Sequence, residues 1–388
     1  MDELRNPFAP GAGNPPPALA GRGELISRAE LIFARAKAGR HAKSLILIGL
    51  RGVGKTVLLN RFCDIARSGG YHAVLLEAPE GKPLAALIVP HLRSLLGRLD
   101  AMGALDITVK RAWRVLKSFV GTIKLKAYDV EISLDPELGA ADSGDLDTDL
   151  ADLLEAIGQA AAARRTAVAL IIDELQYLPD NELGALIMAI HRVSQRSLPL
   201  VLIGAGLPQL VGAAGRSKSY AERLFDYPKI GPLSALDSRK ALAEPVTAEG
   251  ASFSNAALEE IIAVTEGYPY FLQEWGYRAW NAASPDVIDL PAVKAATPEA
   301  LANLDTSFFR VRFDRLTPAE KHYLKAMADL GEGPHRSGDI ADRLGVEVRS
   351  VAPRRNGLIK KGMIYSPAHG DTAFTVPLFD QFMRRTMP

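Results

Sequence analysis

The chain has 388 residues, of which 48% are hydrophobic and 23% charged, and its 46 basic and 45 acidic side chains leave a net charge of +1. This composition is that of a globular protein of two or three domains and excludes a collagen-like, coiled-coil or wholly disordered chain. No stretch of about 18 apolar residues predicts a membrane span, and the single cysteine, Cys63, excludes an internal disulfide and a cysteine-based metal site. Because the N-terminus shows no basic start followed by an apolar segment, we expect a cytoplasmic protein.

The first predicted elements are an arm, a helix and a strand. Residues 1–20 are rich in proline and glycine and predict an extended arm that packs no core. The sequence GRGEL at 21–25 leads into a helix expected over 24–39. Ser44–Gly49 then reads SLILIG, an apolar run ending in glycine that is typical of a buried parallel strand.

Strands and helices alternate from this point to about residue 232. We expect helices over 54–68, 83–99, 146–163 and 181–196, and strands over 44–49, 73–77, 168–172, 200–204 and, as a short fifth, 228–231. Alternation of this kind predicts βαβ units and a doubly wound parallel sheet, hence an α/β domain over 21–232. The stretch 100–145 breaks the pattern with a basic helical segment, an alternating run over 122–134 and an acidic loop, and it predicts an insertion.

The C-terminal third predicts two further parts. Residues 233–310 show no strand pattern and predict a helical domain, whereas 311–388 have the order of a helix–turn–helix followed by two strands around Pro367–Asp371. Four basic residues of the third helix are candidates for binding duplex DNA along one stripe, with the wing near His369 touching the backbone: Arg354, Arg355, Lys360 and Lys361. The alternative is that the same module binds a protein.

Residues 49–56 read GLRGVGKT and satisfy the phosphate-binding pattern G-x-x-x-x-G-K-[ST], between a predicted strand and a predicted helix. Backbone N–H groups of such a loop face an anion. The loop residues are Gly49, Leu50, Arg51, Gly52, Val53 and Gly54. Lys55 is expected to neutralise the β- and γ-phosphates of a nucleotide, and the Thr56 hydroxyl is expected to ligate Mg²⁺.

Residues 169–174 read ALIIDE, an apolar strand that delivers two carboxylates at its C-terminal end, where ligands bind in open parallel sheets. Asp173 is expected to hold Mg²⁺ through water, and Glu174 to orient and deprotonate the attacking water. An apolar run followed by Asp-Glu is also a common strand end with a helix cap, but the upstream GLRGVGKT favours the functional interpretation.

The chain resembles the AAA+ class of P-loop ATPases, and in particular the clade of origin-recognition and initiator ATPases, including bacterial proteins described as Orc-like or AAA_16-type. Besides the two motifs above, the boxes that carry the resemblance are GRGEL at 21–25, LIGAGLP at 202–208, YAERLF at 220–225 and EGYPYFLQEWG at 266–276. The resemblance implies that the backbone of Gly21 and Arg22 lies near adenine. It also implies that Arg223 is an arginine finger acting on the nucleotide of a neighbouring subunit.

What the resemblance implies for the whole chain is a P-loop NTPase core, a helical lid over 233–310 and a C-terminal winged-helix domain over 311–388. The implied activity is hydrolysis of ATP to ADP and phosphate, with Mg²⁺ as cofactor, in a homo-oligomer that binds duplex DNA. The alternative is a signalling switch ATPase whose winged helix binds a protein partner.

Two boxes depart from the family pattern, and one assignment has local competitors. The strand that should end in a polar first sensor ends in Gly204-Ala205-Gly206, and the second-sensor segment holds no arginine before Arg278. These departures predict weak sensing of the γ-phosphate. For Arg223 the alternative is a surface ion pair with Glu222 or Asp226, which contributes little. Nearby cations that could serve instead are Arg216, Lys218 and Arg239.

Overall fold

The computed structural model describes residues 1–11, 13–102, 106–122, 135–368 and 370–387. Most of the alternating run over 122–134 and His369 of the wing therefore lie outside the described residues. The chain divides into two compact units. One comprises residues 23–49 and 55–230, and the other comprises residues 1–22, 50–54 and 231–388. Within the described residues, no helix is long and apolar enough to cross a membrane.

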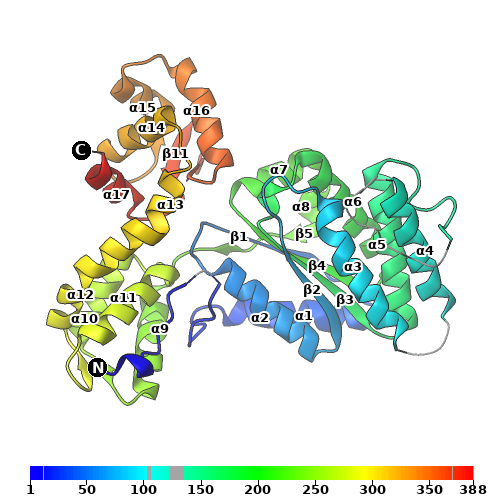
Figure 1. Cartoon of the computed structure of the whole chain (residues 1–388), viewed down its shortest axis with the longest axis horizontal. Coiled ribbons are helices and arrows are strands. Elements are labelled where there is room, and N and C mark those ends of the chain that lie inside the picture. The colour runs from blue at the N-terminus through cyan, green and yellow to red at the C-terminus, as the bar shows by residue number, and fades with distance from the viewer. Residues whose placement is uncertain (12, 103–105, 123–134, 369, 388) are drawn as a thin grey trace. The chain divides into compact units, whose positions relative to one another are not determined.

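The first unit is built on a parallel sheet with the strand order β2-β3-β4-β1-β5, and β6 also pairs with β1 (Figure 1). Its strands are β1 (Ser44–Gly49), β2 (Tyr71–Glu77), β3 (Ala167–Asp173), β4 (Leu200–Gly206), β5 (Phe225–Asp226) and β6 (Lys229–Ile230). Every residue of β1, β3 and β4 is buried, which explains why these strands read as continuous apolar runs rather than alternating ones. The predicted α/β fold with a doubly wound parallel sheet is confirmed.

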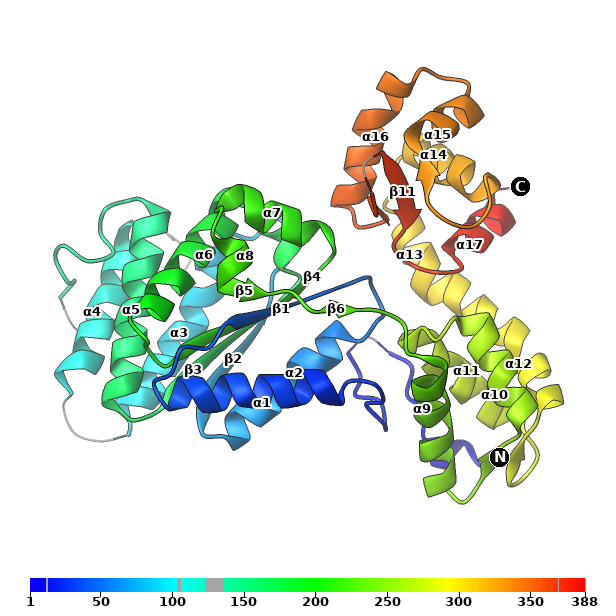
Figure 2. The ribbon, with the colours of Figure 1, turned by 180° about the vertical axis from the view of Figure 1, so that it is seen from behind.

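Helices cover both faces of this sheet (Figure 2). They are α1 (Gly23–Lys37), α2 (Lys55–Ser68), α3 (Leu84–Asp100), α4 (Ile107–Thr122), α5 (Leu146–Ala163), α6 (Asp180–Gln195), α7 (Gln209–Ser217) and α8 (Ala221–Leu224). Ile46 and Ile48 of β1 pack into one core cluster with α3 to α6, whereas the alternate residues of β1 face the side of α2. The stretch predicted as an insertion contributes α4, whose Leu116 and Phe119 are buried in the same cluster.

The second unit is mainly helical. Its helices are η1 (Glu3–Arg5), α9 (Ala235–Ala248), α10 (Asn255–Thr265), α11 (Pro269–Ala282), α12 (Leu290–Asn303), the π-helical turn η3 (Leu304–Phe309), α13 (Arg310–Phe313), α14 (Pro318–Asp329), α15 (Ser337–Leu344), α16 (Val348–Lys360) and α17 (Phe379–Thr386). Its strands are β7 (Ser252–Phe253), β8 (Val287–Ile288), β9 (His335–Arg336), β10 (Ile364–Tyr365) and β11 (Asp371–Phe374). The pair β7–β8 lies in the region predicted to lack strands, because two-residue strands leave no period in a sequence.

The C-terminal part of this unit has the order predicted from the sequence. The helices α14, α15 and α16 precede a β10–β11 hairpin, and β9 adds to β11 to give a three-stranded sheet. Thr317 and Glu320 form a reciprocal capping box at the start of α14, with Pro318 at its first position, as expected. The boundary predicted at residue 310 falls within a continuous aromatic core, because the Phe309 ring contacts Phe271 of α11 and Phe382 of α17.

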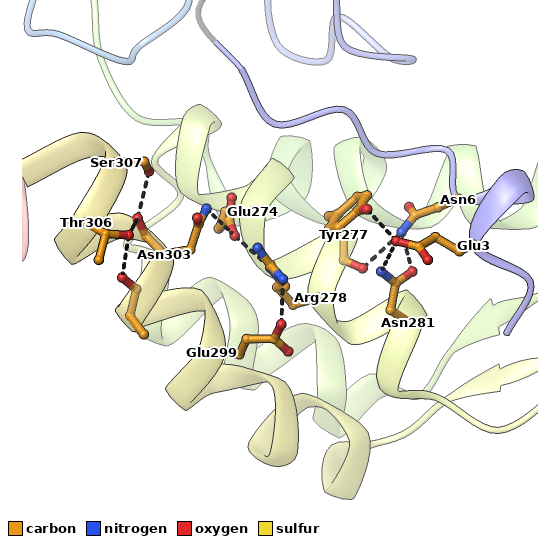
Figure 3. A network of polar contacts seen from close by, with 11 residues as sticks. Glu3, Asn6, Glu274, Tyr277, Arg278, Asn281, Glu299, Asn303, Thr306 and Ser307 are labelled. Atoms are coloured by element: carbon orange, nitrogen blue, oxygen red, sulfur yellow. Dashed lines mark hydrogen bonds and ion pairs between the residues drawn. The ribbon is translucent and has the colours of Figure 1, made fainter.

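The N-terminal arm packs against α11 in the same unit. The Phe8 side chain is only 2% exposed and lies against Gly276, where an added Cβ would be 2.7 Å from the ring. The Asn6 amide donates to the Tyr277 carbonyl at 3.0 Å and to Asn281 Oδ1 at 2.8 Å (Figure 3). The prediction that the arm packs no core is therefore wrong at Phe8. A proline-rich composition does not reveal that one aromatic ring has a glycine as its partner.

Candidate functional site

The loop over 50–54 connects the end of β1 at Gly49 with the start of α2 at Lys55, in the context that the motif requires. Gly52 and Gly54 have φ values of +79° and +93°, a left-handed conformation that glycine adopts without the steric cost of a Cβ. The loop thereby delivers the chain into the N-terminus of a helix, where unpaired N–H groups and the helix dipole favour an anion. The predicted phosphate-binding geometry is present in the backbone.

Lys55, the first residue of α2, carries the positive charge of this loop. Its side chain is 6% exposed, and its Nζ donates to the Gly49 carbonyl at 3.0 Å. The ammonium is therefore held beside the first residue of the phosphate-binding motif. A buried lysine in this position can neutralise phosphate charge with little competition from water.

Thr56 and Asp173 are brought together from α2 and the end of β3. The Thr56 hydroxyl donates to Asp173 Oδ2 at 2.5 Å, and the Asp173 side chain is 5% exposed. Burial raises the pKa of Asp173 above its usual value, while the hydrogen bond from Thr56 acts in the opposite direction. A hydroxyl and a carboxylate side by side fit Mg²⁺, which takes few protein oxygens and keeps phosphate and water ligands. Across the described residues no group of three His, Cys, Asp or Glu side chains could hold a metal instead.

Glu174 follows Asp173 in a strained and well-determined position. Its backbone is left-handed, with φ 55° and ψ 36°, and its N–H donates to Asp173 Oδ1 at 2.8 Å. A non-glycine residue in this region costs on the order of 1–3 kcal/mol and persists only when its surroundings hold it. One carboxylate oxygen of Glu174 accepts a hydrogen bond from the side chain of Gln176. The carboxylate therefore has a fixed direction next to the Thr56–Asp173 pair.

Gln176 is the residue of this site that the motifs did not identify. It lies in the short 3₁₀ helix η2 (Leu175–Tyr177), and its Oε1 also accepts a hydrogen bond from the Leu207 N–H at 3.0 Å. Gln176 thus joins Glu174 to the residue after β4. The signal in the sequence would have been a polar side chain two residues after the Asp-Glu pair.

The glycines at the end of β4 make room for η2. A Cβ on Gly204 would lie 2.4 Å from Leu175 Cδ1, and a Cβ on Gly206 would lie 2.8 Å from Gln176 Oε1. The missing polar side chain on β4 is thus a consequence of close packing. Gln176 supplies an amide at this place from the neighbouring strand end.

Arg223 lies exposed on α8, and within the described part of the chain its side chain makes no hydrogen bond or ion pair. Asp226, its expected local partner, pairs with Arg28 instead. The alternative cations are all engaged in their own ion pairs: Arg216 with Asp180 at 3.8 Å, Lys218 with Asp147 at 2.5 Å and Arg239 with Glu259 at 3.0 Å. The surface ion pair considered as the alternative for Arg223 is therefore not formed.

Within the second unit, the loop over 50–54 is held from two sides. Arg22 Nη2 donates to the Val53 carbonyl at 3.2 Å and to the Gly231 carbonyl at 2.7 Å, and burial lowers the pKa of Arg22. Gly21, with φ +68°, allows close approach to Asp237, which lies 2.8 Å from an added Cβ. These two residues therefore bear on the loop. Their predicted place near adenine stays a prediction.

The other side of the loop contacts the start of α11. The Tyr268 hydroxyl donates to the Arg51 carbonyl, and the Tyr270 N–H donates to the Gly52 carbonyl at 3.3 Å. Arg278, the first arginine of this helix, is instead tied to Glu274 at 3.0 Å and to Glu299 at 2.6 Å (Figure 3). Arg278 is thus part of a structural network of the helical region.

The four basic residues predicted to form one DNA-binding stripe do not share a face. Arg355 donates to Thr372 Oγ1 at 3.0 Å and to Ser366 Oγ at 2.9 Å, which ties α16 to the hairpin. Lys361 pairs with Glu320 at 2.7 Å. Only Arg354, half-buried, and Lys360, exposed, have no such partner among the described residues. The single stripe is corrected because the spacing of six or seven residues ignored which side of α16 packs on the domain.

Comparisons with known proteins give two family matches. Residues 18–203 match the model of an AAA ATPase domain, and residues 306–383 match a domain of unknown function. A search of curated proteins gave no match.

Among solved structures, a Walker-type ATPase of Pyrococcus abyssi is similar in fold, with a TM-score of 0.60 and 17% identity over 96% of this chain and 98% of that chain. The Orc1 protein of Aeropyrum pernix in complex with DNA has a TM-score of 0.45 and 16% identity, covering 96% of this chain and 94% of that one. The RuvB Holliday junction branch migration motor of Thermotoga maritima has a TM-score of 0.44 and 16% identity, covering 91% and 92%.

Proposed function

We propose that this chain, an ATPase of the AAA+ class whose residues 18–203 form an AAA ATPase domain, couples ATP binding and hydrolysis to assembly on duplex DNA. The observation that carries the proposal is the Thr56–Asp173–Glu174 cluster, formed where the phosphate-binding loop enters α2. It combines an oxygen pair suited to Mg²⁺ with a directed carboxylate. Phosphoryl transfer requires mainly such positioning and charge neutralisation.

The chemistry is divided among a few residues. Lys55 and the backbone N–H groups of the loop bind the nucleotide phosphates, while Thr56 and Asp173 would hold Mg²⁺, which supplies charge neutralisation when bound. Glu174 orients the attacking water and accepts its proton. Gln176 positions the Glu174 carboxylate through its side-chain hydrogen bond.

The site is completed by a second copy of the chain. Arg223 is exposed and has no partner in its own chain among the described residues, so its guanidinium is available to the nucleotide of a neighbour. Charge that develops on the transferred phosphoryl group is the natural partner for it. This assignment makes the active ATPase a homo-oligomer.

DNA binding is assigned to α16 of a C-terminal winged helix, on a face different from the one expected. Arg349, Asn356 and Lys360 are exposed at positions seven and four residues apart, and therefore lie along one side of the helix. Basic and amide side chains on a helix that follows a helix–turn are suited to phosphate and base-edge contacts. Arg354 borders this face and has no partner within the described residues.

We expect Arg349→Ala with Lys360→Ala to weaken binding of a labelled duplex and to reduce the slope of log affinity against log salt by about one per lost phosphate contact. ATP binding should be unchanged. Fluorescence anisotropy at several salt concentrations measures both quantities. Arg343→Ala is the matched control, because Arg343 is exposed on α15 but pairs with Asp329 at 3.2 Å.

The second candidate function is a switch ATPase that binds a protein through the same module. It is favoured by the exposed acidic side chains beside the basic face, namely Asp339, Asp342 and Glu347. Duplex affinity and salt slope that are both unchanged in the double variant would replace DNA by a protein partner in the proposal.

A further inference from the structure

Arg312 of α13 lies close to the loop over 50–54 within one compact unit. Its guanidinium carbon is 3.9 Å from the centroid of the Phe308 ring, and its Nη1 donates to the Phe308 carbonyl. The Tyr270 ring stacks on Phe308 with centroids 4.8 Å apart, and the Tyr270 N–H contacts the Gly52 carbonyl. A short chain of contacts therefore leads from the loop to Arg312.

The charge around Arg312 is unusual because it is all of one sign. Burial, together with the positive charge of Arg51, lowers the pKa of Arg312 to about 10, and Arg315 acts in the same direction. No carboxylate pairs with Arg312 among the described residues, and its Nε is buried with no hydrogen-bond partner. By contrast, Arg278 in the same unit has two glutamates.

A guanidinium removed from water is costly unless an opposite charge compensates it. Stacking on Phe308 stabilises a cation but leaves its charge uncompensated. An anion near the loop would supply that compensation and would also relieve the repulsion from Arg51. A nucleotide polyphosphate is the anion that a phosphate-binding loop brings to this place.

We propose that Arg312 binds the phosphates of the nucleotide held by the loop over 50–54. The inference rests on the proposed ATP site and adds a phosphate ligand from outside the AAA ATPase domain. Arg312 lies in the helix that joins the helical region to α14, so the contact passes nucleotide occupancy directly to the C-terminal module. It also provides a cation in a unit whose first helical arginine, Arg278, is engaged elsewhere.

The test compares two arginines of the same short helix. Arg312→Gln should weaken ATP binding by about ten- to a hundredfold, the range expected for a lost charge-assisted hydrogen bond. Arg310→Gln is the matched control, because Arg310 is 55% exposed and pairs with Asp314 at 3.3 Å. Its ATP affinity should stay within about twofold of the unaltered protein. Titration with a fluorescent ATP analogue, with circular dichroism to confirm the fold, measures both variants.

An ATP affinity of Arg312→Gln within twofold of the unaltered protein overturns the inference. If that variant does not fold, Arg312→Lys keeps the cation but removes the planar fork, and a loss of about threefold or more is expected; unchanged affinity overturns the inference here too. Failure of the proposed ATP site looks different, because the unaltered protein itself would then bind no ATP.

Discussion

Replacing Arg223 by alanine should lower steady-state ATP turnover by about a thousandfold or more, because an arginine finger stabilises charge that exists only in the transition state. ATP affinity should stay close to that of the unaltered protein, since the nucleotide is bound by the loop of another subunit. The structural reason is that Arg223 is exposed, while Asp226, its expected partner, is taken by Arg28. Phosphate release at saturating ATP and a parallel binding titration measure the two effects.

The control for this prediction is Arg216→Ala, which removes a neighbouring exposed arginine that already has Asp180 as a partner. Turnover in that variant should be close to normal. Mixing Arg223→Ala subunits with Lys55→Ala subunits should restore part of the activity, because some interfaces then combine an intact loop with an intact finger. No recovery, together with weakened ATP binding by Arg223→Ala alone, would contradict an action between chains.

Glu174→Gln should retain ATP binding and lower turnover by about a hundred- to ten-thousandfold, the contribution typical of a general base. The amide has the same shape and can still accept the hydrogen bond from Gln176, but it cannot take a proton from water. Single-turnover measurement of phosphate release separates this chemical defect from nucleotide exchange.

Glu77→Gln is the matched control, because Glu77 is the carboxylate at the end of the neighbouring strand, opposite Asp173 in the sheet register. Its turnover should stay within about twofold of normal, since its side chain points to solvent. An unchanged rate in Glu174→Gln, or an equal loss in Glu77→Gln, would remove the base from Glu174.

The sheet and the phosphate-binding loop could be predicted because their signals are local. Strands β1, β3 and β4 are buried on both faces, so each is a short apolar run, and the loop is fixed by its own glycines and Lys55. The Thr56–Asp173 contact joins residues 117 positions apart, yet it was predictable because the ends of parallel strands converge at one edge of a sheet.

The rest depends on packing that no local pattern records. Gln176 reaches Leu207 only because the glycines of β4 let η2 approach closely. Phe8 is buried because Gly276 leaves space on α11. Arg355 was predicted to face DNA from its charge and spacing, but its guanidinium is used to tie α16 to the hairpin. In each case a tertiary neighbour decides what a side chain does.

The most direct test is an equilibrium titration of ATP with Mg²⁺ against the unaltered protein and against Lys55→Ala. Lys55 is buried beside Gly49, so its removal deletes the phosphate counter-charge while leaving the exposed surface of the domain nearly unchanged. The account predicts saturable binding of one ATP per chain by the unaltered protein, and binding by Lys55→Ala that is abolished or weakened by about a hundredfold or more. Equal ATP affinity of the two proteins would contradict it.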